Sequence, residues 1–208
     1  MTRQGVMKAA LLFSSMFFLL GVGAVQAQQG EALYASCAAC HGADGAGNVA
    51  LNSPALAGQL PDYLQRQLHH FKSGVRGADP KDAPGLQMRG MASTLADDAS
   101  IAAVVVYIGS LPPAQGAAVE YDQRNGANQY NAACGACHGA KAQGNSALNA
   151  PRLAGLDAVY LRRQYNNFAA GIRGSHPDDR YGKQMQMMAK VLSSEKDIND
   201  VMGYIVSQ

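Results

Sequence analysis

The chain has 208 residues, and its 17 Lys and Arg nearly balance its 15 Asp and Glu, which leaves a formal charge of +2. This balance excludes the strongly basic surface typical of nucleic-acid binding, so we expect no nucleic acid as a partner. The chain has no Trp and only five Phe, three of which lie in the first 27 residues. Each half of the remainder, about 90 residues, therefore has little core to spare, and a large planar cofactor would fill the gap.

Residues 1–27 have the pattern of a secretory signal peptide. Arg3 and Lys8 precede an almost uncharged apolar run, and Val25-Gln26-Ala27 places small residues three and one positions before an expected cleavage point. The run is too short and wrongly flanked for a dependable membrane anchor, and no later stretch is apolar enough to cross a bilayer. We therefore expect an exported, periplasmic protein with at most peripheral membrane association.

The rest of the sequence is one unit written twice. A shift of 97 positions, without a gap, superimposes one half on the other. The matched pairs include Cys37 with Cys134, Cys40 with Cys137, His41 with His138, Pro54 with Pro151, Tyr63 with Tyr160, Phe71 with Phe168, Arg76 with Arg173, Met88 with Met185 and Met91 with Met188. The period is too long and the copies too few for a solenoid, so we expect two tandem domains.

In the first copy, the Gly-rich residues 42–48 form a predicted loop, and Pro61 and Asp62 open a segment whose apolar residues recur at helical spacing until Gly74. A second predicted helix carries an apolar stripe from Ile101 to Leu111. Pro112 and Pro113 then break the chain, which predicts an N-terminal domain over 28–111, a linker over 112–120 and a C-terminal domain over 121–208.

The second copy repeats these signals. Residues 139–147 form the predicted loop, and residues 158–171 and 198–205 form the two predicted helices. Ser194 and Asp197 have the spacing of a capping box before the last helix. No strand pattern competes with these helices, so the sequence predicts an all-α fold.

Two sequences of the form Cys-x-x-Cys-His, Cys37 to His41 and Cys134 to His138, are typical of covalent c-type haem attachment. Two cysteines one helical turn apart can bond the two vinyl groups of one haem edge, and the adjoining His then lies beneath the iron. The sequence thus predicts two covalently attached c-type haems, one per domain. Structural zinc would need cysteine pairs closer together, and a disulfide or thiol-exchange role leaves the His after both pairs unexplained.

An iron that cycles electrons needs a second axial ligand opposite the His. The other histidines, at 69, 70 and 176, have no His at their matching positions, which disfavours a shared bis-His arrangement. Methionines do recur, and Met88 and Met185 each follow their His by 47 residues. We favour these two as the ligands, because they lie farther from the last helix than the alternative pair, Met91 and Met188, and can more easily fold across the haem face.

Three further pairs of repeated residues have candidate roles at the haem sites. A backbone carbonyl of Pro54 or Pro151, thirteen residues after each His, is a candidate acceptor for the other imidazole N–H. Arg76 and Arg173 are candidates to pair with haem propionates or with the other domain. Tyr63 and Tyr160 are candidates to donate to propionates or to pack.

The two halves together resemble the two-haem cytochromes c4, which are built from two class I cytochrome c domains. Nearly all of residues 28–208 carries the resemblance, through the haem motifs, Pro54-Ala-Leu-Ala-Gly58, Phe71-Lys-Ser-Gly74-Val-Arg76, Met88 and Tyr107-Ile108 with their second copies. It implies His/Met ligation in each domain and electron delivery from a quinol-oxidising complex toward a terminal oxidase. Ala96 departs from the family, which usually has a Ser or Thr there to start the last helix.

The function expected from these features is that of an electron carrier, not an enzyme, because both irons would have two protein ligands and no third catalytic constellation is present. Two alternatives stay open at this point. One is a two-haem peroxidase-like enzyme with a displaceable ligand, and the other is the cytochrome subunit of a dehydrogenase.

Overall fold

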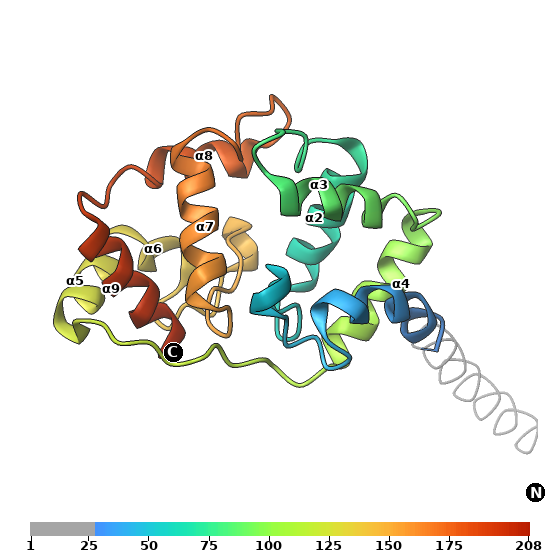
Figure 1. The fold of residues 1–208 in the computed structure, drawn as a ribbon, viewed down its shortest axis with the longest axis horizontal. Coiled ribbons are helices and arrows are strands. Elements are labelled where there is room, and N and C mark those ends of the chain that lie inside the picture. The colour runs from blue at the N-terminus through green and yellow to red at the C-terminus, as the bar shows by residue number, and fades with distance from the viewer. Residues whose placement is uncertain (1–27) are drawn as a thin grey trace, which may run out of the picture.

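A computed structural model describes residues 28–208, and the predicted signal peptide lies outside these residues. Figure 1 shows two helical lobes, joined by an extended segment that runs along one edge. Residues 28–41 are helical, and the labelled elements that follow are η1 Val49–Leu51, α2 Pro61–Ser73, α3 Ala83–Ala92, α4 Asp98–Ser110, α5 Gln123–Ala133, α6 Gly135–His138, η2 Ser146–Leu148, α7 Ala158–Ala169, α8 Arg180–Met188 and α9 Glu195–Val206. Over this range the only β-type pairing is two isolated bridges, so the all-α prediction is confirmed.

The four helices expected from apolar periodicity are α2, α4, α7 and α9. Leu64 and Phe71 of α2, and Leu161 and Phe168 of α7, are buried at the expected spacing. In α4 and α9 the apolar stripes form the centre of each domain core. Periodicity predicts these helices correctly because each buries one continuous face.

The last helix of each domain begins with a side-chain cap. The Asp97 carboxylate accepts a hydrogen bond from the Ser100 N–H at 2.8 Å, and the Ser194 hydroxyl accepts one from Asp197 N. These caps are repeat partners, and Asp97 directly follows Ala96, the position where the sequence departs from the family. Ala96 therefore costs the helix nothing, because the capping residue is Asp97.

The sequence analysis missed the helix that precedes each haem motif. Residues 28–41 form one continuous helix, whereas in the second copy α5 ends at Ala133 and α6 begins at Gly135. The break accommodates one extra residue, since the Gly30-x-x-x-Tyr34 pattern recurs as Gly126-x-x-x-Tyr130 at a shift of 96. A search that allowed one inserted residue would have found this signal.

This first helix crosses the last helix of its domain at close range. A Cβ on Gly30 would collide with the carbonyl oxygen of Ala103, and a Cβ on Gly126 with that of Asp200. Glycine is required at both crossings because the backbones are in direct contact. The Tyr34 and Tyr107 rings, and likewise the Tyr130 and Tyr204 rings, pack beside the crossings with centroids 5.2 and 5.1 Å apart.

The two lobes contact each other through reciprocal hydrogen bonds. Arg66 donates to the side chain and backbone oxygens of Asn149 at 2.9 and 2.8 Å, and its repeat partner Arg163 donates to those of Asn52 at 2.6 and 2.7 Å. Each domain thus uses the same arginine and the same asparagine to contact the other domain. Such a reciprocal pattern arises when two units are related by a two-fold rotation. The domains therefore pack as a pseudo-symmetric pair. Within residues 28–208, no helix has the length and apolar character that crossing a bilayer requires.

Candidate haem-binding sites

The two haem-attachment motifs lie at equivalent places in the two lobes. Cys37, Cys40 and His41 close the helix over 28–41, and Cys137 and His138 lie in α6 directly after Cys134. In each motif the first cysteine is half-buried and the second is exposed, and none of the four is disulfide-bonded. Each motif thus presents two thiols along one edge of its domain.

The environment of the cysteines argues against thiol-exchange chemistry. Burial, with a smaller contribution from Cys137, raises the pKa of the Cys134 thiol to about 11. Burial likewise raises the pKa of Cys37. Reactive redox cysteines have a lowered pKa, because the thiolate is the nucleophile. These thiols suit covalent attachment to haem better than disulfide exchange.

Each motif histidine is buried and oriented by a backbone carbonyl. His41 Nδ1 lies 2.8 Å from the Pro54 carbonyl oxygen, and His138 Nδ1 lies 2.9 Å from that of Pro151. Burial lowers the pKa of both imidazoles, which keeps them neutral, and the proline carbonyl then accepts the Nδ1–H. This confirms the predicted role of the two prolines, and it leaves the lone pair of Nε2 available for a metal.

Met88 is the sulfur that faces a motif histidine. Its Sδ atom lies 3.5 Å from His41 Nε2, although 47 residues separate the two along the chain. Met185 occupies the matching position on α8 and is half-buried. Met91 and Met188 are each 38% exposed.

The methionines lie on two short helices, α3 and α8, that the sequence analysis did not predict. The Asp82 carboxylate caps α3 by accepting from Gly85 N at 3.1 Å, and Asp179 caps α8 by accepting from Gly182 N at 2.8 Å. Gly77 has a φ of +75°, and a Cβ there would collide with the Gly85 carbonyl. The capped end of the methionine helix is thus held against the preceding loop.

Two tyrosines that the sequence analysis did not consider fix the attachment motifs in place. The fully buried Tyr34 donates to the Gly42 carbonyl oxygen at 2.8 Å, and Tyr130 donates to that of Gly139 at 2.7 Å. Each glycine directly follows its motif histidine. The tyrosines therefore lock the end of each motif against the first helix of the domain.

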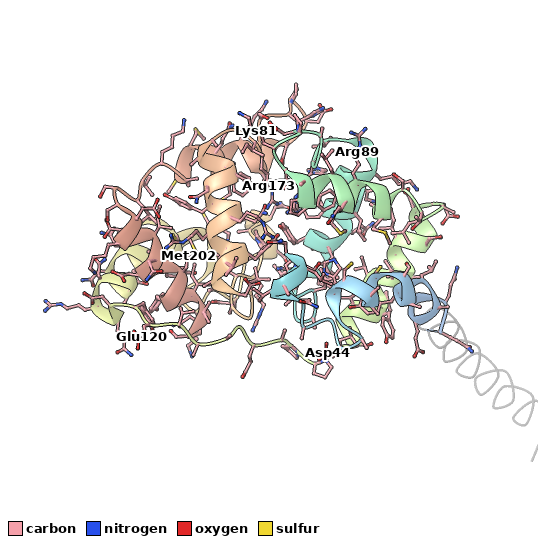
Figure 2. The ribbon with its side chains drawn as sticks, in the orientation of Figure 1. Asp44, Lys81, Arg89, Glu120, Arg173 and Met202 are labelled. Carbon is pink, nitrogen blue, oxygen red and sulfur yellow. The ribbon has the colours of Figure 1, made fainter. Side chains whose placement is uncertain are left out.

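Arg76 and Arg173 meet between the domains, so each has the interdomain role that was one of the two left open for it. Arg76 donates to Gln67 in its own domain at 2.7 Å and to Tyr160 and Gln164 in the other domain, both at 3.2 Å. Its partner makes the mirrored bonds, from Arg173 to Gln164, Tyr63 and Gln67, at 2.7, 3.1 and 3.0 Å. Figure 2 labels Arg173, which lies where the two lobes meet.

This interdomain cluster provides a test of whether the chain fits haem. Both guanidinium groups are buried, all their hydrogen-bond partners are neutral, and the Nε–H of each has no partner. Buried cations need anions, and buried donors need acceptors. Haem carries propionate groups that would supply both, so the residues present fit haem as the cofactor.

A pair of covalent attachment motifs, each in its own helical domain and each with a carbonyl-oriented histidine, defines a two-haem c-type cytochrome. The cytochrome c family matches residues 27–112 and again residues 123–208. The chain is 34% identical to cytochrome c4 of Azotobacter vinelandii, over 88% of each chain. It is 33% identical to a protein of Stutzerimonas stutzeri called thiosulfate dehydrogenase electron acceptor, over 79% of this chain and 81% of that one.

The fold agrees with these sequence relationships. The crystal structure of reduced recombinant cytochrome c4 from Pseudomonas stutzeri superimposes with a TM-score of 0.68 at 30% identity, covering 86% of this chain and 96% of that one. The chain belongs to the cytochrome c4 family, with two cytochrome c domains in tandem. Its members are electron carriers and not enzymes, so the peroxidase alternative is set aside.

Proposed function

We propose that the chain is an exported periplasmic carrier that accepts single electrons from a quinol-oxidising complex and delivers them toward a terminal oxidase. In this proposal residues 1–27 direct export, and residues 112–120 link domains over 28–111 and 121–208. His41 and Met88 hold one iron, and His138 and Met185 hold the other. The observation that carries the proposal is the approach of Met88 Sδ to His41 Nε2, at 3.5 Å.

The described residues account for what such a carrier needs. When bound, each haem supplies an iron that changes oxidation state by one electron. The chain holds each imidazole neutral and fixed through a proline carbonyl, which sets the donor strength of Nε2. A methionine sulfur as second ligand would raise the reduction potential of the iron and would leave no open position for peroxide. The buried arginines supply positive charge between the domains.

The ligand assignment is tested by replacing each methionine in the protein with both haems attached. We expect Met88→Ala and Met185→Ala each to remove about half of the sulfur-to-iron absorption band, because each removes one axial ligand of one haem. The matched controls, Met91→Ala and Met188→Ala, should leave the band intact. Loss of the band in the controls instead would overturn the assignment. Mass analysis showing fewer than two haem adducts would overturn the carrier proposal itself.

A second candidate donor is favoured by one comparison. The Stutzerimonas stutzeri relative is named as the electron acceptor of a thiosulfate dehydrogenase. If this chain has the same donor, a thiosulfate dehydrogenase should reduce the oxidised protein in the presence of thiosulfate. Rapid reduction by a quinol-oxidising complex, with none by the dehydrogenase, would favour the first candidate. A stable one-to-one complex with the dehydrogenase would identify the chain as its cytochrome subunit.

A further inference from the structure

The segment that joins the methionine helix to the last helix is held differently in the two domains. In the N-terminal domain, Lys72 on α2 donates from Nζ to the carbonyl oxygens of Leu95 and Ala96, the latter at 3.0 Å. The repeat partner of Lys72 is Ala169, whose side chain has no donor. The lysine attachment is therefore particular to the first domain.

In the C-terminal domain the same segment is held by a phenol. The N–H of Leu192, which lies between α8 and α9, donates to the hydroxyl oxygen of Tyr165 on α7 at 3.1 Å. The repeat partner of Tyr165 is Leu68, which packs into the core of the first domain. There the matching N–H, that of Leu95, donates to the Ala92 carbonyl oxygen at 3.2 Å.

The two attachments act on one position of the repeat. Leu95 and Leu192 are repeat partners, and the first is held through its carbonyl by an ammonium group, whereas the second is held through its amide by a neutral hydroxyl. Burial raises the pKa of Tyr165, which keeps the phenol neutral. The two methionine helices end one repeat position apart, because α3 runs to Ala92 and α8 to Met188.

We propose that Lys72 and Tyr165 are positioning residues. Each holds the segment that follows the methionine helix of its domain, here called the methionine segment, and the two do so by different chemistry. Each residue therefore sets the strength of one sulfur-to-iron bond independently of the other. The proposal rests on the assignment of Met88 and Met185 as ligands. A methionine leaves the iron more readily when its helix and the segment that follows it can move away. Each hydrogen bond that holds the segment therefore opposes that departure, and its loss should ease the entry of a competing ligand.

The test is a titration of the oxidised two-haem protein with imidazole, which competes with methionine for the iron. Loss of the sulfur-to-iron band is followed for each haem, and the haems are assigned with Met88→Ala and Met185→Ala. We expect Lys72→Met to raise the imidazole affinity of the first haem about 3- to 10-fold, because it removes the two hydrogen bonds of the lysine, and Tyr165→Phe to have an effect of similar size on the second haem, because it removes one. The other haem should stay unchanged in each case.

Matched controls and a rescue separate positioning from general stability. Lys81→Met removes an exposed lysine of the first domain, labelled in Figure 2, whose side chain has no hydrogen bond. Tyr204→Phe removes a hydroxyl of the second domain that bonds Ala140 and not the methionine segment. Both should leave the affinities unchanged. The double variant Tyr165→Leu with Ala169→Lys installs the first domain's attachment in the second, and should restore part of the lost resistance to imidazole.

Two results would overturn the inference. Equal changes at both haems from a single variant would show a general loss of stability, and changes no larger than those of the controls would show that the segment is held by other contacts. Failure of the ligand assignment is recognised separately, because Met88→Ala and Met185→Ala would then leave the band in place before any imidazole is added. If the ligand assignment holds but the Lys72 and Tyr165 variants leave the imidazole affinities unchanged, only this inference is wrong.

Discussion

At the scale of single residues, the C-terminal domain contains a buried carboxylate that has no counterpart in the first domain. Asp200 on α9 is 3% exposed and accepts from Lys196 Nζ at 2.6 Å, from Asn125 Nδ2 at 2.7 Å and from the Asp122 N–H at 3.0 Å. Burial alone would raise the pKa of this carboxyl, but the three donors outweigh it and lower the pKa to about 2. In its ionised form, Asp200 therefore links the start of α5 to α9 through hydrogen bonds.

This carboxylate makes the stability of the domain depend on pH. Because its pKa in the folded protein lies below the unfolded value of about 3.9, its stabilising effect is complete above that value and is lost as the pH falls toward 2. We expect Asp200→Asn to lower the free energy of unfolding by about 1–3 kcal/mol at pH 7. The difference from the unaltered protein should shrink at pH 2.5.

Urea unfolding at both pH values measures the effect, with Asp178→Asn as control, because Asp178 is an exposed carboxylate. A loss of stability of the same size at both pH values would show that the carboxylate charge is not responsible.

At the scale of elements, the methionine helices show how a side-chain cap and tertiary contact create a helix that periodicity does not predict. Pro84, Gly85 and Gly90 in α3 read as loop residues when the sequence is considered alone. Pro84 is nevertheless tolerated, because it lies in the first turn, where its missing N–H would have no helical partner. The 3%-exposed Asp82 then satisfies the Gly85 N–H.

We expect Asp82→Ala to destabilise the protein by about 0.5–2 kcal/mol, because the first turn of α3 loses its cap. The sulfur-to-iron band of the N-terminal haem should also be lost at lower temperature than that of the C-terminal haem. Asp82→Asn, which keeps a side-chain acceptor, should have a much smaller effect. Thermal unfolding followed at this band makes the comparison, and equal damage from both substitutions would show that the cap is not the reason.

At the scale of the whole molecule, the domains meet through polar contacts that are related by a two-fold rotation and contain two buried guanidinium groups. Each arginine also lies over a phenylalanine ring of its own domain, with 4.5 Å between Arg76 Cζ and the Phe71 centroid and the same distance between Arg173 and Phe168. Each guanidinium group packs on the phenylalanine ring of its own domain and donates hydrogen bonds to a tyrosine and a glutamine of the opposite domain. The orientation of one domain on the other is fixed by these directional bonds.

We therefore expect the pair Arg76 and Tyr160 to be energetically coupled across the interface. A double-mutant cycle with Arg76→Met and Tyr160→Phe should give an interaction free energy of about 0.5–3 kcal/mol in urea unfolding. The exposed Arg124→Met, combined with Tyr160→Phe in the same way, should give no interaction free energy, and an additive cycle for Arg76 and Tyr160 would contradict the prediction.

The features that could be predicted from the sequence are those carried by a short motif or repeated along the chain. Cys-x-x-Cys-His is a local motif, a shift of 97 is visible without coordinates, and the helices α2, α4, α7 and α9 each bury one continuous apolar face. The proline carbonyl partner of each histidine was a candidate from its fixed distance along the repeat, and the structure selects it.

Contacts between residues far apart in the chain became visible only in the folded molecule. The tertiary structure brought Arg76 to Tyr160 and Gln164 of the other domain, set Met88 against His41, and held the matching leucines by Lys72 in one domain and by Tyr165 in the other. The physical reason is that each side chain had several partners of suitable chemistry in the sequence. Which one lies within hydrogen-bond distance is set by the packing of whole helices and by the rotation that relates the two domains, and neither is encoded in a local pattern.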